Sequence, residues 1–186
     1  KVELSETFAK LKEDPALVIT DAGISAGRPA DAAAGASDSF SILFARYKGD
    51  LKQAAEGAKA LEMIQDGDPI LISEAVHIIA IGDIGTEKLP DWIRQYTGKA
   101  PEFHFASGTE FPEDVSGYKL IVHCGGCMLN AREMKSRLRS AADQEIPMTN
   151  YGILIAYMKG ILKRSMGHWS RSGRKFGRRN ERKERK

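Results

Sequence analysis

A chain of 186 residues with 42% hydrophobic side chains is long enough for one or two domains with a buried core, which excludes a wholly disordered protein. No apolar run approaches the roughly twenty residues of a membrane span, and no signal-peptide pattern opens the sequence, so we expect a cytoplasmic protein without membrane association. The two cysteines form one C-x-x-C, which excludes a disulfide framework. The net charge of +3 is unevenly placed: residues 165–186 hold nine Lys or Arg against two Glu, so the remaining residues carry −4.

The first part of the chain predicts a small, incomplete domain. Leu4–Leu11 has apolar residues at helical spacing, and Leu17–Thr20 has the apolar, β-branched composition of a short buried strand. Residues 22–37, rich in Ala and Gly, predict a loop that serves as a hinge or domain boundary. The sequence therefore indicates a separate unit before residue 39.

From residue 39 onward the pattern alternates between helices and strands. The predicted helices are Phe40–Lys48, a second that Asp50 caps and that runs to Ile64, Asp91–Tyr96, Asn130–Gln144, and Tyr151–Arg164 after an Asn150 cap. The predicted strands are Pro69–Ile72, Phe103–Phe105 and Leu120–Val122. This alternation indicates an α/β fold for residues 66–164, with a parallel, doubly wound, Rossmann-like sheet flanked by helices.

Two thiols stand directly after one of these strands. The strand at 120–122 is followed by H-C-G-G-C, with Cys124 and Cys127 at its ends, and then by a helix that Asn130 caps, with Glu133 at the third helical position. In open α/β sheets this turn lies at the carboxyl edge of the strand, where ligands bind, and the following helix directs free N–H groups toward it. The sequence therefore predicts an anion-tolerant site built on the turn.

A C-x-x-C on such a turn has three interpretations: half of a metal site, a redox dithiol, or two cysteines that pack in the core. The Gly125–Gly126 pair argues against a purely structural role, because two glycines carry an entropic cost and allow backbone N–H groups to approach sulfur. His123 supplies a third potential ligand. We favour metal or cluster binding over the other two interpretations.

Two thiols do not complete a tetrahedral metal site, which takes four ligands. His77 lies just past the end of the strand at 69–72, so in a parallel sheet it shares the edge with Cys124. Glu74 and Asp83 are further candidates near that edge. For His104, inside a strand, we expect a hydrogen-bonded structural residue.

Other functional classes find no support in the sequence. No phosphate-binding loop of the form G-x-x-x-x-G-K-[ST] occurs, and no catalytic triad or carboxylate pair can be singled out. The basic segment 165–186, which includes Trp169 and Phe176, is interpreted as a solvated, disordered tail with weak nonspecific polyanion binding. We therefore assign no catalytic residue, and no cofactor-binding residue beyond the metal ligands.

Several motifs together resemble one family. The segments H-C-G-G-C-M-L-N-A-R-E-M at 123–134 and I-P-M-T-N-Y-G-I-L-I-A-Y-M-K-G-I-L-K-R at 146–164 are similar to the C-terminal region of HydF, the GTPase maturation factor of [FeFe]-hydrogenase. The stretches S-F-S-I-L-F-A-R-Y-K-G-D at 39–50 and D-I-G-T-E-K-L-P-D-W-I-R-Q-Y at 83–96 extend the resemblance, which covers most of residues 15–164.

The resemblance implies a cytosolic bacterial scaffold that combines a GTPase domain, a dimerisation domain and an iron–sulfur domain. Residues 1–38 would then be part of the dimerisation domain, residues 39–164 the iron–sulfur cluster-binding domain, and residues 165–186 a tail without counterpart. We expect the GTPase domain to be absent from this chain, which would have no enzymatic activity of its own. A homodimer is the expected assembly.

The family also implies a cofactor and partners. Its members bind a [4Fe–4S] cluster through three cysteines, and one iron keeps an open site linked to carrying a di-iron precursor, made with two radical-SAM maturases, to apo-[FeFe]-hydrogenase. Cys124 and Cys127 match the paired cysteines of the family, and His123 its histidine.

The first cysteine of the family pattern is replaced here. After Glu74-Ala75, Val76 stands at the cysteine position and Ile78 at the histidine position. His77 could substitute as a nitrogen ligand, or the cluster could be lost or shared between the chains of a dimer. Our hypothesis is a scaffold that binds an iron–sulfur cluster; the alternatives are a cluster-less module for dimerisation and protein contacts, and a C-x-x-C dithiol redox protein.

Overall fold

A computed structural model describes residues 18–20, 37–74, 84–108, 110–163 and 166. Its first two strands, β1 (Val18–Thr20) and β2 (Ser37–Ser39), pair in parallel as a small sheet. β1 confirms the strand predicted at the end of the first segment. The helix predicted at 4–11 and the basic tail from 167 onward lie outside the described residues. β2 continues directly into α2 (Phe40–Lys48), so the boundary predicted after residue 38 falls inside β2.

The main sheet has four parallel strands in the order β4-β3-β5-β6. This confirms the predicted α/β class with a parallel sheet. The sequence reading missed β6, because three residues are too few for an alternation pattern and Asn150 had been interpreted as a helix cap; it is both the last strand residue and the N-cap of α6. The strands are β3 (Pro69–Glu74), β4 (Glu102–Ser107), β5 (Leu120–His123) and β6 (Met148–Asn150).

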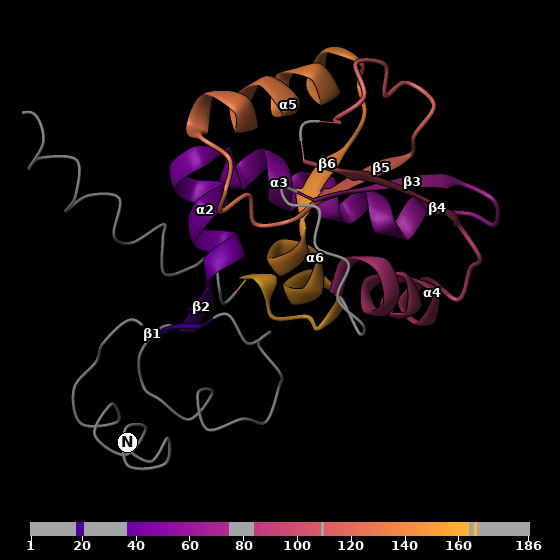
Figure 1. Ribbon diagram of the computed structural model, residues 1–186. Helices are drawn as coiled ribbons and strands as arrows, with labels where there is room; N and C mark the ends of the chain where they lie inside the picture. Colours follow the sequence, from indigo (N-terminus) through magenta and orange to yellow (C-terminus); the bar gives the residue numbers. More distant parts are fainter. Residues whose placement is uncertain (1–17, 21–36, 75–83, 109, 164–165, 167–186) are drawn as a thin grey trace, which may run out of the picture.

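Helices cover both faces of this sheet (Figure 1). Strand β3 divides the core by alternation: Ile70 and Ile72 pack with α2, α3, α4 and α6, whereas Leu71 packs with α5 on the other face. The described part of the chain contains no helix long and apolar enough to cross a membrane. The remaining helices are α3 (Leu51–Ala58), α4 (Leu89–Thr97), α5 (Ala131–Asp143) and α6 (Tyr151–Met158).

Local signals in the sequence decide most helix ends. Asp50, Asn130 and Asn150 each accept a hydrogen bond from the backbone N–H three residues on, at 2.8–2.9 Å, as N-caps do. Gly98 ends α4 in the left-handed conformation with φ +65°.

Two helices end earlier than predicted. α3 stops at Ala58 and continues as a 3₁₀ helix, η2 (Lys59–Met63), and α6 stops at Met158 before Gly160 with φ +69°. A π-helical turn, η3 (Ile84–Lys88), directly precedes α4.

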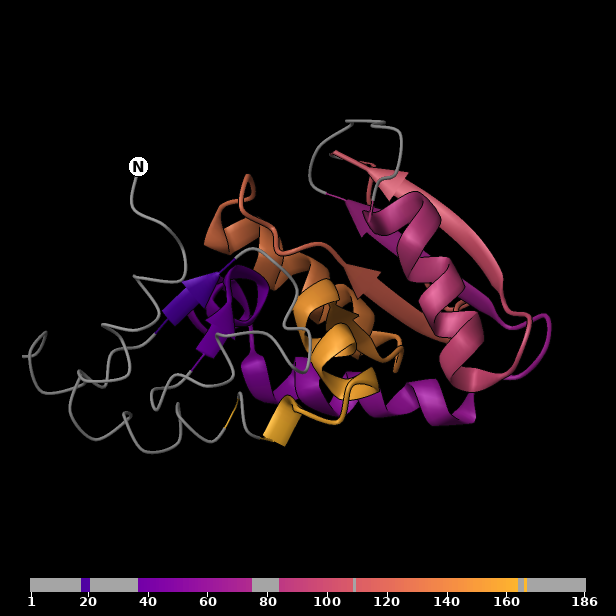
Figure 2. The same cartoon turned by 90° about the horizontal axis from the view of Figure 1, so that it is seen from below.

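The strand order changes direction at β3 and β5. From β3 the chain moves outward to β4, and it then returns to place β5 on the opposite side of β3, which can be followed in Figure 2. Ligands of open α/β sheets bind at the carboxyl ends of the strands at such a point. The C-G-G-C turn begins there.

Candidate functional site: the cysteine turn

The turn starts as a continuation of the sheet. Cys124 follows the last residue of β5, and its N–H donates to the Ser73 carbonyl at the end of β3 at 2.8 Å. The Cys124 thiol is half-buried against the core of the α2–α6 face, whereas Cys127 is exposed. Neither cysteine forms a disulfide bond. The two sulfurs therefore lie at the carboxyl edge of β5, as predicted, and neither is enclosed in the core.

Different structural constraints favour glycine at the two positions between the thiols. Gly126 adopts φ +66°, and an added Cβ would come within 2.4 Å of Met134 Cε. Gly125 faces α2, where an added Cβ would lie 3.1 Å from Ser41 Oγ. The turn is thus fitted between α2 and α5, and this close approach explains the Gly-Gly pair without a ligand.

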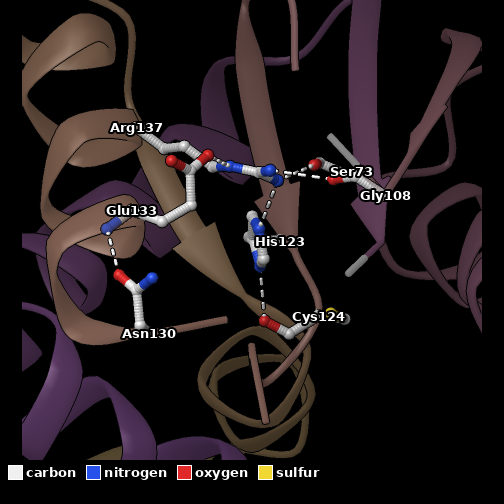
Figure 3. Close-up of polar contacts among 7 residues, drawn as sticks. All are labelled: Ser73, Gly108, His123, Cys124, Asn130, Glu133 and Arg137. Carbon is white, nitrogen blue, oxygen red and sulfur yellow. Dashed lines mark hydrogen bonds and ion pairs between the residues drawn. The ribbon is translucent and has the colours of Figure 1, made fainter. Parts of the chain in front are cut away.

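Arg137 anchors the first half of the turn (Figure 3). It is 2% exposed on the inner side of α5, and its Nε donates to Glu133 Oε1 at 2.8 Å. Its Nη2 donates to the Gly108 carbonyl at 2.8 Å, and its Nη1 lies 3.2 Å from His123 Nε2. One guanidinium therefore joins α5 to the last residue of β5 and to the residue that follows β4.

His123 links Arg137 to the backbone of the first cysteine. Its Nδ1 lies 2.7 Å from the Cys124 carbonyl oxygen, so Nδ1–H is the donor and Nε2 the acceptor from Arg137. Burial is the main cause that lowers the pKa of His123 from 6.5 to about 4; the Cys124 carbonyl opposes this shift and the Arg137 charge adds to it. The ring is neutral at pH 7. Direct metal binding by His123 would require one of its two hydrogen bonds to break.

Lys48, the last residue of α2, anchors the second half. Its Nζ donates to the carbonyls of Cys127 and Leu129, both at 2.9 Å, and to that of Gly126 at 3.3 Å. The ammonium also lies 4.7 Å from the centre of the Phe44 ring. The three N–H donors of the ammonium match these three carbonyl acceptors, so Lys48 fixes the backbone conformation next to the exposed Cys127 thiol.

A hollow of about 340 Å³, partly open to solvent, lies beside Cys124. Its lining is mainly apolar and includes Phe44, Met134 and Leu138 from α2 and α5. Thr149 of β6 also lines it, and its buried Oγ1 has no hydrogen-bond partner among the described residues. The first thiol therefore borders a small space with one unsatisfied polar atom.

Three of the four residues predicted as metal ligands are close in the sequence, but their side chains do not form a metal site. His123 ends β5 and Cys124 and Cys127 follow in the turn, whereas His77, with Val76 and Asp83, lies outside the described residues. Across the ranges that the structure describes, no three His, Cys, Asp or Glu side chains are grouped so that they could hold a metal ion.

The two remaining candidates have structural partners. Glu74 accepts a hydrogen bond from the Tyr151 hydroxyl at 2.9 Å. His104 lies 3.0 Å from Glu102 and 3.3 Å from the Tyr118 hydroxyl, which confirms the predicted hydrogen-bonded role.

Sequence reasoning missed the two basic residues that hold the turn. Arg137 had a detectable signal, because it lies with Met134, Leu138 and Ala141 on the apolar stripe of α5, where an unpaired charge would be costly. Lys48 had none, since its acceptors lie 78–81 residues away in the sequence. The capping box was predicted in part: Asn130 caps α5, but the Glu133 side chain binds Arg137.

Residues 52–168 match the protein family described as the hydrogen maturase F tetramerization domain. The match includes the cysteine turn and every strand of the main sheet. Comparison with curated proteins gives no match.

Proposed function

The chain belongs to the hydrogen maturase F tetramerization domain family, and on that premise we propose that it is a scaffold that presents Cys124 and Cys127 to an iron–sulfur cluster. Family membership implies a part in hydrogenase maturation and in homo-oligomerisation. The observation that carries the proposal is the turn itself, which places two cysteines outside any disulfide, one exposed and one half-buried, at the point where the strand order reverses.

The donor chemistry of the turn fits such a cluster in part. Thiolates are the ligands that iron–sulfur clusters take, and both thiols lie outside the packed core. They are two donors where a [4Fe–4S] cluster uses three or four. We propose His77 as the third, because β3 ends at Glu74 on the same edge and imidazole replaces thiolate in some clusters.

In this proposal the chain positions the two cysteines and does not itself react. The Cys124 N–H bond to Ser73 and the His123–Arg137 contact fix the first sulfur, while Lys48 fixes the backbone next to the second. The Lys48 ammonium also places a positive charge next to a site that would hold anionic thiolates, whereas the Arg137 charge is paired with Glu133. A bound cluster would supply an iron with an exchangeable coordination position. No residue is assigned a catalytic role, and we propose that this chain by itself is not an enzyme.

Family membership also supports a more specific role in hydrogenase maturation. We propose that the loaded scaffold receives a di-iron precursor made with the radical-SAM maturases and helps to deliver it to apo-[FeFe]-hydrogenase. The exposed side of the turn, where Cys127 lies, is the side from which such partners would approach.

Anaerobic reconstitution with iron and sulfide, followed by EPR of the reduced protein, tests the proposal. We expect a [4Fe–4S] signal that is lost in Cys124→Ser and in Cys127→Ser and weakened in His77→Ala. His104→Ala is the matched control, because its ring is held by Glu102 and Tyr118 away from the turn, and it should keep the signal. Val76→Cys should give a more stable cluster.

Two results would overturn the cluster proposal in favour of a different function. A chain that takes up no cluster and whose thiols do not react with each other would be a module for protein contacts alone. A reversible Cys124–Cys127 disulfide with a measurable potential, again without cluster uptake, would indicate a dithiol redox protein.

A further inference from the structure

The two edges of the main sheet differ in how they are closed. β6 is buried along its whole length, and α3 lies directly against its backbone: a Cβ added at Gly57 would come within 2.3 Å of the Met148 carbonyl oxygen. β4, at the other edge, has no fully buried residue, and Phe105 is 51% exposed. An open, six-residue edge is a template for pairing with another strand.

The backbone hydrogen bonds of β4 show which of its N–H and C=O groups point toward β3 and which point away from the sheet. The N–H of Glu102 donates to the Asp68 carbonyl, and the N–H of Gly108 donates to the Glu74 carbonyl, so even-numbered residues face β3. Because backbone groups alternate along a strand, the N–H and C=O of Phe103 and Phe105 point away from the sheet. Among the described residues no strand pairs with β4 on that side, and in both views β4 lies at the margin of the sheet (Figures 1 and 2).

We propose that β4 pairs with β4 of a second copy of this chain, antiparallel across a two-fold axis that passes beside His104. Phe103 of each copy then exchanges two backbone hydrogen bonds with Phe105 of the other, and the two sheets join into one. The inference rests on family membership, which implies self-association, and on the geometry of β4; it does not depend on cluster binding.

The register is self-complementary, which is what a two-fold interface requires. Three residues of β4 have outward backbone groups, Phe103, Phe105 and Ser107, and the Ser107 carbonyl already accepts from the Glu110 N–H at 3.1 Å. A half-turn about His104 places the two phenylalanines opposite each other without a shift. Glu102 then stands opposite Ala106 of the second copy, so no two carboxylates oppose each other across the strands.

The side chains favour the same arrangement. Phe103 and Phe105 point to one face of β4, so pairing gathers four phenylalanine rings on one face of the joined sheet. Arg94 of α4 lies 4.9 Å from the Phe103 ring. The groove of about 1010 Å³ along α4 and β4 is lined by Arg94 together with Glu87, Asp91 and Glu102. This lining holds one basic and three acidic side chains, so charge does not favour self-pairing, and the outward backbone groups and the phenylalanine rings carry the interface.

Sedimentation equilibrium of the full chain tests the surface. We expect the native chain to sediment at a multiple of 20.4 kDa, and Phe105→Lys to halve that mass. Phe105→Pro should do the same, because it removes one outward N–H and leaves the bonds to β3 intact. Met63→Lys, at a side chain that is 70% exposed on η2, is the control and should keep the native mass.

A cross-link tests the register. In the proposed pairing the two copies of residue 104 form a non-hydrogen-bonded pair with Cα atoms about 4.5 Å apart, which a disulfide can span. With Cys124 and Cys127 replaced by Ser, His104→Cys should give a covalent dimer on mild oxidation, and Glu102→Cys should not.

Three outcomes would overturn the proposal. The first is a native mass that Phe105→Lys leaves unchanged, and the second is a native chain that sediments as a monomer. The third is protection of the Phe105 amide from exchange that does not change on dilution, because protection of that kind would mean that another segment of the same chain covers β4.

Discussion

The two halves of the cysteine turn are held in opposite ways. The half that begins at Cys124 continues β5 and is fixed by His123 and Arg137, both less than 3% exposed. The half that contains Cys127 is exposed and is fixed by the single ammonium of Lys48. A buried anchor is costly to break because water cannot replace it, whereas exposed carbonyls can take water instead. We therefore expect the first thiol to be fixed and the second to be adjustable.

Arg137→Met should have the largest effect. The substitution leaves His123 Nε2 and the Gly108 carbonyl without their donor and Glu133 without its ion-pair partner. We expect the free energy of unfolding to fall by about 4 kcal/mol, because two acceptors lose their donor at roughly 2 kcal/mol each. The Glu133 carboxylate, whose side chain is 43% exposed, can be hydrated instead. Urea denaturation monitored by circular dichroism measures it.

Arg139→Met, on the exposed side of the same helix, is the matched control and should change the free energy of unfolding by less than about 0.5 kcal/mol. Equal losses in the two variants would mean that the buried contacts of Arg137 add nothing to stability.

Lowering the pH should reduce the stability of the fold through His123, which holds the half of the turn that begins at Cys124. The pKa of His123 is about 4 in the folded chain and 6.5 in the unfolded one, so the unfolded chain takes up the proton first as pH falls. The metal-free protein should therefore lose stability between pH 6.5 and pH 4, by up to about 3 kcal/mol from this residue. Above pH 6.5 His123 should contribute no pH dependence.

Urea denaturation of the native chain and of His123→Gln at several pH values isolates this contribution, since glutamine does not titrate. The difference between the two profiles should be flat above pH 6.5 and should slope below it. A difference that stays constant down to pH 5 would contradict the assignment.

Lys48→Met should have the smallest effect on global stability, about 1 kcal/mol, because water can reach the carbonyls it leaves. The local effect should be larger. The Leu129 amide donates to the Gly126 carbonyl within the Lys48-bound segment, and the Cys124 amide donates to Ser73 within the sheet. Hydrogen exchange should accelerate at Leu129 and stay unchanged at Cys124.

Lys52→Met, at an exposed lysine early in α3, is the control and should alter neither amide. If both amides of Lys48→Met exchanged faster to the same extent, the two halves of the turn would be one cooperative unit and would not be held independently.

The local chemistry of the site could be predicted because it lies within a few residues. The apolar run at 120–122, the Gly-Gly pair and the Asn130 cap place a strand, a turn and a helix in that order, and the structure confirms all three. The neighbours of the turn could not be predicted. Ser73 contacts the turn, and Gly108 its anchor Arg137, only because parallel strands bring their ends to one edge of the sheet; Ser41 lies beside Gly125 because α2 packs there.

The contrast between the sheet edges has the same origin. Phe103-His104-Phe105 predicts a strand, and the structure confirms it as β4. Alternation alone does not say whether a strand lies in the middle of a sheet or at its edge, since that depends on the order in which distant strands pair. Three-residue β6 gave no periodic signal at all, and its burial comes from α3 and β5.

The sequence by itself determined most of the elements, their caps and the pair of thiols, because propensity, capping and turn geometry act over three or four residues. Tertiary structure alone decided that β4 is an edge strand with no further strand beside it among the described residues, whereas α3 covers β6. It also decided that His123 is neutral and engaged at both ring nitrogens, and that Arg137 and Lys48 hold the two ends of the turn. These features arise from burial and from contacts between segments far apart in the chain, and no local pattern encodes either.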